Sequence, residues 1–317
     1  MIKENLKNKL NHYGSLKEPF LFINSYDSSM NDFFLLKDLP QDVNFEMNVK
    51  VSSKINKNIQ IKKELISFKA YKKKFDTIQE EIKSGNSYLL NLTCKTKINC
   101  DLSLVQIYDL AKSKFKIKYK NEFVCFSPER FIEIKKNKIS TYPMKGTIDA
   151  NLPNAKTRIL GDLKEMAEHT MVVDLLRNDL SMVSSNVRVN TFRYIDKINA
   201  GNKELLQISS KISGNLESSW RNNIGDILDK LLPAGSITGC PKINTVKILK
   251  NVEAYERGYY TGICGVFDGE NLDTFIMIRF IEKSKEDLFY KSGGGITCDS
   301  DVSSEYKELE DKIYIPA

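Results

Sequence analysis

The segment STYPMKGTID, residues 140–149, places a lysine in a predicted turn at the end of a strand. Residues 140–142 (Ser-Thr-Tyr) are typical of a strand, Pro143 interrupts strand pairing, and Gly146 permits a tight bend. The lysine in this turn, Lys145, is either a solvated surface charge or an amine that points into a pocket. The neighbouring elements must decide between these alternatives.

A predicted hairpin brings a carboxylate close to this lysine. The segment FIEIKKNKISTYPM alternates apolar residues on either side of a Lys-Lys-Asn-Lys turn. If the turn is centred on Asn137, Glu129 and Lys145 are equally distant from the centre and face each other. Directly opposed residues of antiparallel strands have Cβ atoms about 5 Å apart. The pattern therefore predicts a carboxylate and an amine at one end of the same hairpin.

Four glutamates form two pairs with helical spacing. Glu165 and Glu168 lie in the predicted helix GDLKEMAEHTMVVDLLRNDL, and Glu305 and Glu308 lie in the predicted helix SSEYKELEDKIY. Residues three positions apart share one face of a helix. Sites made only of carboxylates suit Mg²⁺, which usually takes one or two carboxylates and keeps several waters. The alternative is that both pairs lie on solvated faces, where Glu308 and Lys312 form an ordinary ion pair.

Two glycine-rich segments and one arginine are further candidates for ligand binding. SITGCPK is a glycine loop that enters a helix, where free N–H groups favour an anion. SGGGIT follows a strand, and its glycines would let the backbone approach a ligand closely. Each segment is equally compatible with a plain turn. Arg279 interrupts the apolar strand IMIRFI, where its planar side chain would bind a carboxylate or form a structural ion pair.

The composition is that of a globular protein with a sizeable core. Hydrophobic residues make up 41% of the 317 residues and charged residues 28%. The formal net charge is +7, but the lysines are scattered and form no basic stripe with aromatic residues, which argues against a nucleic-acid partner. The longest apolar runs have the length of strands, and the N-terminal MIKENLKNKL lacks a signal-peptide core. We therefore expect a cytoplasmic protein without a membrane partner.

The number and spacing of the cysteines and histidines argue against several kinds of metal site. The six cysteines form no CxxC pair, which argues against zinc and thioredoxin-like chemistry, and we expect reduced, packed thiols. The chain has only two histidines, His12 and His169, so a site with several histidine ligands is excluded.

The chain divides into a short N-terminal part, residues 1–70, and a longer part, residues 71–317. The first part mixes short apolar runs with lysine-rich stretches, which predicts a few strands. The second part begins with a helix that Gly85 closes and a strand in NSYLLNLTCKTKI, and it ends in a β-meander followed by a helix. No linker separates the two parts, so we expect one continuous globule.

Seven segments of the longer part, taken together, resemble the chorismate-utilising enzymes, the family that contains the large components of anthranilate synthase and aminodeoxychorismate synthase. They occur in the order found in that family and cover roughly residues 75–317. The matching segments are SPERF, PMKGT, AEHTMVVDLLRNDL, GSITGCPK, RGYYTGICGVF, DTFIMIR and GGGITCDSDVSSEYKELEDK. Seven ordered segments are a far more specific signal than any single glycine motif.

The resemblance implies an α+β fold in which antiparallel sheets form a sandwich that helices surround, with the active site between them. It also implies a reaction. Lysine in PMKGT is typical of aminodeoxychorismate synthases, whereas anthranilate and isochorismate synthases usually have alanine there. Lys145 would then be a nucleophile that adds to C2 of chorismate in its uncharged form, and Glu129 of SPERF would be the general acid that helps the C4 hydroxyl leave. Ammonia would displace the lysine and give 4-amino-4-deoxychorismate, a precursor of 4-aminobenzoate and folate.

The resemblance assigns further roles by position. Mg²⁺ would neutralise the ring carboxylate of chorismate, held by Glu168 and Glu308 with Glu165 and Glu305 nearby or bridged by water. The residues that would line the substrate site are Arg279, Tyr260, Gly294 and Gly295 around the enolpyruvyl carboxylate, Thr238 and Lys242 of SITGCPK near the ring carboxylate, and His169.

The chain also departs from the family pattern. Leu89 stands where members that use an amine have glutamine and members that use water have a lysine base. No glutamine amidotransferase motif and no lyase segment are visible, so a partner subunit would supply ammonia and another enzyme would release pyruvate. The alternatives are an anthranilate synthase large component, which Lys145 argues against, an isochorismate synthase, which Leu89 argues against, and a non-enzymatic basic binding protein.

Overall fold

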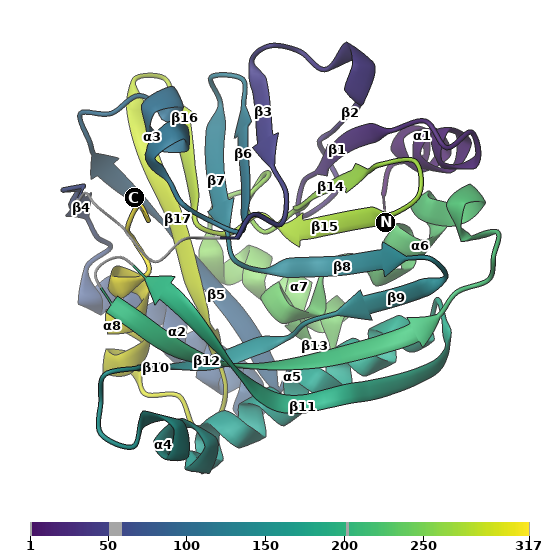
Figure 1. The fold of residues 1–317 in the computed structure, drawn as a ribbon. Coiled ribbons are helices and arrows are strands. Elements are labelled where there is room, and N and C mark those ends of the chain that lie inside the picture. The colour runs from purple at the N-terminus through teal and green to yellow at the C-terminus, as the bar shows by residue number, and fades with distance from the viewer. Residues whose placement is uncertain (1, 51–58, 201–202, 317) are drawn as a thin grey trace.

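The computed structural model describes residues 2–50, 59–200 and 203–316 (Figure 1). Two antiparallel sheets form its centre and helices lie around them. The helices are α1 (Glu4–Ser15), α2 (Phe68–Lys83), α3 (Leu104–Leu110), α4 (Ala155–Gly161), α5 (Leu163–Ser181), α6 (Ile224–Leu231), α7 (Lys242–Glu253) and α8 (Val302–Asp311), with short 3₁₀ turns η1 (Leu36–Asp38), η2 (Trp220–Asn223) and η3 (Gly235–Ile237).

The first sheet contains β1 (Phe20–Asn24), β2 (Asn31–Leu35), β8 (Arg130–Lys135), β9 (Lys138–Thr141), β10 (Met144–Asp149), β11 (Ser185–Ala200), β12 (Lys203–Asn215), β14 (Ile263–Phe267) and β15 (Leu272–Ile276). Its strand order is β10-β12-β9-β8-β15-β14-β1-β2, and β11 also pairs with β12.

The second sheet contains β3 (Val43–Glu46), β4 (Lys62–Glu64), β5 (Leu89–Asn99), β6 (Phe115–Tyr119), β7 (Phe123–Ser127), β13 (Gly239–Cys240), β16 (Phe280–Ser284) and β17 (Asp287–Ile296). Its order is β13-β5-β17-β16-β7-β6-β3, with β4 paired to β5.

The two sheets pack against each other through an apolar layer, and helices cover their other faces. Leu21 and Phe275 of the first sheet join Phe115 and Phe123 of the second in one buried cluster. Helices α1, α5 and α6 pack on the other face of the first sheet, and α2, α7 and α8 pack beside β5 and β17. The predicted α+β class, with antiparallel sheets surrounded by helices, is confirmed.

The N-terminal residues belong to both sheets. Strand β1 pairs with β14 in the first sheet, and β3 pairs with β6 in the second. Helix α1 was not expected from the sequence, yet its Leu6 and Leu10 are fully or almost fully buried in the core cluster that includes α5 and α6. Polar residues dominate the helix, so only the spacing of these leucines indicates its buried face.

The predicted hairpin exists, but its register is wrong by one residue. Ile134 faces Ile139 and Lys135 faces Lys138, so the turn consists of Lys136 and Asn137. Strand β9 ends before Pro143, and the chain then enters β10, which pairs with β12. Lys145 therefore faces Ile208 and not Glu129. A proline that cannot donate to the ladder explains this change of partner strand.

The predicted single strand across IMIRFI is two strands in different sheets. Strand β15 ends at Ile276 in the first sheet and β16 begins at Phe280 in the second. Arg279 lies at the crossing and has a φ of 55°. A side chain in this left-handed region costs about 1 kcal/mol, and such residues concentrate at functional sites.

Among the helices that the structure describes, none is long and apolar enough to cross a membrane.

Candidate active site

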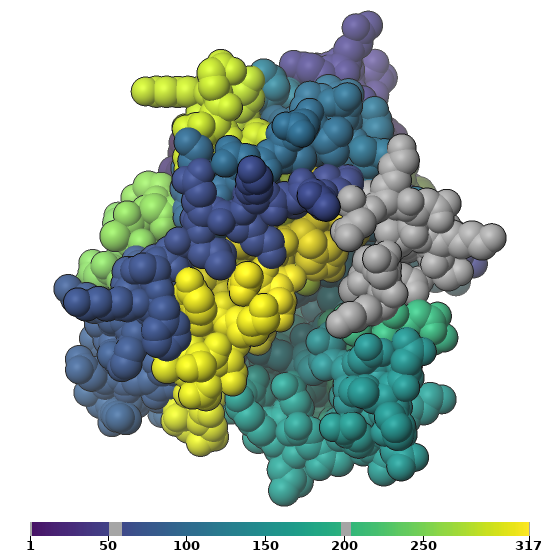
Figure 2. Space-filling model, turned by 90° about the vertical axis from the view of Figure 1, so that its left-hand side faces the viewer, coloured from purple at the N-terminus to yellow at the C-terminus, as the bar shows by residue number. Residues whose placement is uncertain are grey.

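A cavity of about 240 Å³ lies where β10 and β12 of the first sheet approach β5 and β17 of the second. In Figure 2 a recess separates the C-terminal helix α8, in yellow, from the teal surface of the segment that includes β10 and α4. The side chains and glycines that line the cavity are Asn91, Glu129, Met144, Lys145, Gly146, Thr147, Val172, Gln207, Ser236, Ile237, Tyr260, Ile278, Arg279, Tyr290, Lys291, Ser292, Gly293, Gly295, Glu308 and Lys312.

Lys145 extends into this cavity from β10. The pairing of β10 with β12 shifts between Lys145 and Thr147, and Gly146 at the shift has a φ of 71°. The Lys145 Nζ lies 3.7 Å from Glu168 Oε2, and a Cβ placed on Gly295 would lie 3.2 Å from the same nitrogen. The amine thus spans the cavity from one sheet towards a glycine of the other, and any larger residue at Gly295 would crowd it.

Glu129 reaches the same cavity from the short connection between β7 and β8. Its backbone N–H donates to Ser127 Oγ at 3.1 Å, and Ser236 Oγ donates to Glu129 Oε1 at 2.8 Å. Burial raises the pKa of Glu129, while the hydrogen bond from Ser236 and the charge of Lys145 act in the opposite direction. A carboxyl with a raised pKa retains its proton at higher pH, as a general acid requires.

The predicted glutamate pairs lie on α5 and α8, close to Lys145 and to the glycines of β17. A Cβ on Gly146 would lie 2.9 Å from Glu165 Oε2, and a Cβ on Gly294 would lie 3.2 Å from Glu305 Oε2 and 3.6 Å from Glu308 Oε1. The carboxylates of Glu165 and Glu305 thus lie close against the glycines of the strands, and a side chain at Gly146 or Gly294 would require them to shift.

Three of these carboxyl groups have shifted pKa values, and the shifts differ in direction. Burial and the neighbouring Glu168 raise the pKa of Glu165, and burial and Glu308 raise the pKa of Glu305. Burial also disfavours the ionised form of Glu308, but Lys312 outweighs it and lowers the pKa of Glu308. Lys312 Nζ lies 2.5 Å from Glu308 Oε1 and donates to the Gly293 carbonyl at 2.8 Å.

Arg279 and Tyr260 form the other wall of the cavity. The Arg279 Nη1 donates to the carbonyl of Lys312 at 2.7 Å, and its guanidinium lies 4.7 Å from the centre of the Tyr314 ring. No carboxylate pairs with Arg279 in residues 2–50, 59–200 and 203–316. Tyr260 is 3% exposed and lies in the same wall. The Arg279 guanidinium is thus held by a backbone carbonyl and an aromatic ring, and it could pair with the carboxylate of an acidic ligand.

Seven predicted site residues are not among those that line the cavity: Glu165, Glu168, Glu305, Gly294, Lys242, Thr238 and His169. Other parts of the protein engage the last three. Lys242 Nζ pairs with Asp179 at 2.8 Å and donates to the Leu231 carbonyl at 3.0 Å. Thr238 is fully buried, and its carbonyl accepts from the Asn91 N–H at 3.0 Å. These contacts hold the SITGCPK loop against α5 and β5, so both residues act on the site through the position of the loop.

His169 is the third of these residues. It is fully buried between α5 and β12, and its Nε2 lies 2.7 Å from Ser210 Oγ. Burial lowers the pKa of His169 to about 4, with a further contribution from Arg193. The ring is therefore neutral near pH 7 and joins a helix to the sheet that carries Lys145.

Sequence reasoning missed several residues of the cavity. Ser236 lies inside the quoted SITGCPK segment, but its spacing from Glu129 gave no signal because 107 residues separate them. Gln207 belongs to β12, a strand that was not predicted although NVRVN in the adjoining β11 alternates in the manner of a strand. For Lys312 the sequence indicates only an ion pair with Glu308, whereas the structure places it in the lining of the cavity.

A buried ion pair fixes the loop that carries Ser236. Arg257 Nη2 lies 2.6 Å from Glu253 Oε1, and both side chains are at most 3% exposed. The same guanidinium donates to the carbonyls of Ile237 at 3.0 Å and Asn91 at 2.7 Å. One arginine thus joins α7, the loop and β5.

Replacing this arginine should strongly destabilise the fold. Arg257→Met leaves Glu253 buried without its partner, which costs about 3–5 kcal/mol of the free energy of unfolding. Urea unfolding of wild type and variant measures this loss in the free energy of unfolding. Lys72→Met is a matched control, because the Lys72–Asp76 pair is 50% exposed at each side chain and should contribute less than about 1 kcal/mol. Equal effects of the two substitutions would show that the Arg257 pair does not anchor the loop.

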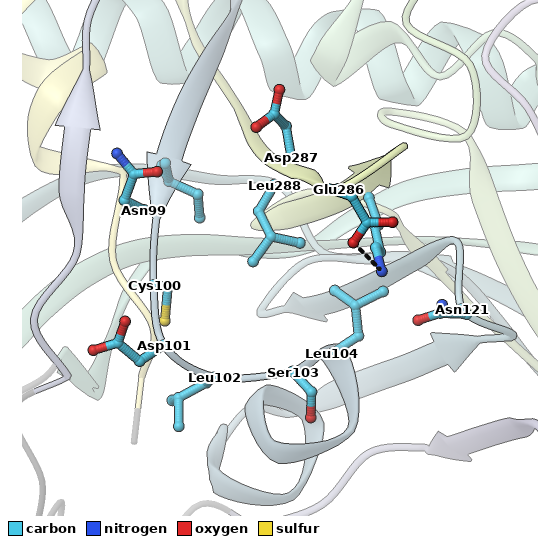
Figure 3. A pocket seen from close by; sticks show the side chains of 12 residues that line it. Asn99, Cys100, Asp101, Leu102, Ser103, Leu104, Asn121, Glu286, Asp287 and Leu288 are labelled. Atoms are coloured by element: carbon cyan, nitrogen blue, oxygen red, sulfur yellow. Dashed lines mark ion pairs between the residues drawn. The ribbon is translucent and has the colours of Figure 1, made fainter.

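A larger hollow of about 400 Å³ lies elsewhere, below the turn between β16 and β17 (Figure 3). The residues that line it include Asn99 at the end of β5, Asp101 in the loop that follows and Asp287 at the start of β17, and Glu286 at its rim lies 3.6 Å from Lys283. Lys283 is the one amine among the described residues that line this hollow, and its partner Glu286 is 95% exposed, so the hollow lacks the combination of an amine and a partly buried acid that lines the smaller cavity.

Comparisons with known proteins agree with this geometry. A model of the chorismate binding enzyme family matches residues 36–317. The "Uncharacterized PabA-like protein" of Haemophilus influenzae is 44% identical over 310 residues, which cover 96% of this chain and 94% of that protein. The "Aminodeoxychorismate synthase component 1" of Bacillus subtilis is 32% identical and covers 75% of this chain, which spans about half of that relative, 53% of its length.

The fold agrees as well. The crystal structure of anthranilate synthase component I from Streptococcus pneumoniae superposes with a TM-score of 0.67 at 24% identity, over 81% of this chain and 59% of that one. Since the family model covers most of the sequence and a relative above 30% identity covers three quarters of it, the chain belongs to the chorismate binding enzyme family.

Proposed function

We propose that this protein aminates chorismate at C4 and releases 4-amino-4-deoxychorismate, the precursor of 4-aminobenzoate for folate. The observation that carries the proposal is the amine of Lys145, which extends into the same cavity as the partly buried acid Glu129. The relative named aminodeoxychorismate synthase component 1 supports this choice. Anthranilate synthase remains the alternative within the family.

The reaction follows from these two groups. The neutral Lys145 Nζ attacks C2 of the ring, both ring double bonds move, from C1=C2 and C5=C6 to C1=C6 and C4=C5, and the C4 hydroxyl leaves as water with the proton of Glu129. Ammonia then attacks C4, both double bonds return, and the C–N bond to lysine breaks, so that lysine leaves as the neutral amine. The new ammonium group at C4 gives one proton to the Glu129 carboxylate, which restores the acid. Chorismate and ammonia thus give the amino product and one water.

Arg279 would hold a carboxylate of chorismate at the opposite wall. Replacing it with methionine removes a charge-assisted hydrogen bond, so KM for chorismate should rise about 30-fold, which corresponds to about 2 kcal/mol. The value of kcat should change less, because in this proposal the guanidinium binds a carboxylate and takes no part in making or breaking bonds. Steady-state kinetics at saturating ammonium measure both. An unchanged KM with a reduced kcat would place Arg279 in the chemical step instead.

The four glutamates suit a magnesium ion by the chemistry of their oxygens. Mg²⁺ takes one or two carboxylates and completes its shell with water and ligand oxygens, so it does not require the three-residue cluster that the described part of the chain lacks. Repulsion from Glu168 contributes to the raised pKa of Glu165, and repulsion from Glu308 contributes to that of Glu305. A bound cation would relieve this repulsion. We propose Glu168 and Glu308 as ligands, with Glu165 and Glu305 nearby or bridged by water; bound there, the ion would neutralise the ring carboxylate.

We also propose that a glutamine amidotransferase subunit supplies the ammonia. The B. subtilis relative is named as component 1, which supports a second component. In this proposal the chain itself binds chorismate and carries out the amination, and the partner only delivers the nitrogen.

Incubation with chorismate, Mg²⁺ and ammonium, followed by mass spectrometry of the products, tests the function. The proposal expects 4-amino-4-deoxychorismate that still carries the enolpyruvyl group, loss of activity with a chelator, and recovery on adding Mg²⁺. Formation of anthranilate alone would contradict C4 amination. Full activity in the presence of the chelator would contradict the magnesium site.

A further inference from the structure

The hydroxyl of Ser236 is the only side-chain group in the described part of the chain that donates a hydrogen bond to the carboxyl of Glu129. The donor–acceptor distance, from Ser236 Oγ to Glu129 Oε1, is 2.8 Å. Lys145 and Lys312 influence the same carboxyl by charge alone. Ser236 also lines the cavity, so the contact lies where the proposed reaction takes place.

The loop that carries Ser236 is held rigidly on both sides. Arg257 binds the carbonyl of Ile237, the residue that follows Ser236, and a Cβ on Gly235, which precedes it, would lie 2.8 Å from Leu175 Cδ2. The N–H of Asn91 binds the carbonyl of Thr238. A hydroxyl on such a fixed segment can impose an orientation on its partner, because it cannot follow the partner's movements.

Building on the proposed function, we propose that Ser236 is a positioning residue that orients the carboxyl of Glu129, so that Oε1 accepts the serine proton and Oε2 carries the proton given to the leaving hydroxyl. A protonated carboxyl has one O–H and one free acceptor oxygen. Since Oε1 is occupied as an acceptor, the acidic proton belongs on Oε2. After the proton has left, the serine hydroxyl stabilises the buried carboxylate that remains.

The hydrogen bond from Ser236 opposes the effect of burial on the pKa of Glu129. Burial raises the pKa of Glu129, and the hydrogen bond from Ser236 works against that rise because it favours the ionised form. Without the hydroxyl the acid would hold its proton more tightly and would also lose its fixed orientation. Both changes slow proton transfer to the C4 oxygen, since transfer is fastest when the acid is correctly aimed and its pKa lies near the working pH.

The sign of the stability effect follows from this shift. Glu129 has a pKa above its ordinary value of 4.5 in the folded protein, so its contribution to stability is largest at low pH and is lost as pH rises through the folded-state pKa. In Ser236→Ala the ionised carboxyl lacks its donor. The loss of Tm caused by Ser236→Ala should therefore be small at pH 4.5 and should increase as pH rises further, through the folded-state pKa of Glu129. A serine that only fills space would produce the same loss at every pH.

A double-mutant cycle with thermal unfolding tests the contact without requiring turnover. Wild type, Ser236→Ala, Glu129→Gln and the double variant are unfolded across the pH range. The proposal expects the pH-dependent part of the Ser236→Ala effect to disappear in the Glu129→Gln background. Persistence of that pH dependence without the carboxyl would overturn the proposal. Ser113→Ala, a buried serine whose hydroxyl binds the Ser127 carbonyl at 2.8 Å, is the matched control with an expected pH-independent effect.

Kinetics test the consequence for catalysis. Ser236→Ala should reduce kcat at least 10-fold with little change in KM for chorismate, and the break in the pH–rate profile that belongs to Glu129 should move to higher pH. Ser236→Thr keeps the hydroxyl and should restore the position of that break. An unmoved break in Ser236→Ala would overturn the positioning role. Absence of the aminated product with wild-type protein would instead overturn the proposed function, while the unfolding cycle still reports on the contact.

Discussion

Lys145→Ala should reduce formation of 4-amino-4-deoxychorismate by about a thousandfold or more, because the nucleophile that opens the covalent route is missing. The cavity around it should remain, since Lys145 is not part of any core cluster in the described structure. Binding of chorismate, measured by thermal shift, should therefore be retained. Product mass and rate, with ammonium as the nitrogen source, provide the measurement.

Lys164 offers a matched control for this substitution. Its Nζ lies 3.8 Å from Glu168 Oε1, close to the 3.7 Å between Lys145 and Glu168 Oε2, but its side chain is 46% exposed and lies outside the cavity. Lys164→Ala removes a similar charge from the same carboxylate and should leave the rate within a few-fold of wild type. If Lys145→Ala made the same product at the same rate, Lys145 would have no part in the mechanism.

Glu129→Gln should have the second largest effect, a loss of about 10²–10⁴-fold in kcat, the usual contribution of a general acid. Glutamine preserves the size of the side chain and can accept from Ser236, but it has no acidic proton to give to the C4 oxygen. The break in the pH–rate profile that belongs to this carboxyl should disappear as well. The profile of the variant compared with that of wild type is the measurement.

The contrary result for Glu129 would be a variant with full kcat and an unchanged pH profile. Glu133 provides a comparison, since it is a buried glutamate on the neighbouring strand β8 that pairs with Arg130 and Lys135 outside the cavity. Glu133→Gln should affect stability and leave the pH breaks of the reaction in place. If the two variants had similar pH–rate profiles, Glu129 would not be the general acid of the reaction.

Much of the fold could be predicted because local signals agree with the tertiary structure. The helix that ends before Gly85 has its glycine at a φ of 75°, and α5 and α8 lie where the glutamate pairs with helical spacing predict them. Helix α1 and strands β11 and β12 were missed. In α1 the buried Leu6 and Leu10 are separated by polar residues, so the core that the helix joins is visible only in the folded chain. In β12 the buried Leu206 and Ile208 do alternate with a polar residue, so this strand had a signal in the sequence.

The site was predicted in part, and the predictions that were wrong have a common cause. The hairpin argument placed Glu129 opposite Lys145, and both do line one cavity, but on separate segments and not as a strand pair. Pro143 moves the chain to another strand, a change of partner that alternation of residues does not encode. Likewise, the contact between Ser236 and Glu129 joins segments 107 residues apart, and Lys242 was assigned to the ligand although Asp179 binds it.

The central claim is that the nitrogen of Lys145 forms a bond with the ring of chorismate, and mass spectrometry of the protein tests it most directly. Wild-type protein, chorismate and Mg²⁺ are mixed without ammonia, and the intact mass and the peptide that contains residue 145 are measured. The account predicts an increase equal to one chorismate less one water, located on Lys145, absent from Lys145→Ala and removed by adding ammonium. Rapid amination by wild type with no adduct on Lys145 at any time in the ammonia-free mixture would contradict it.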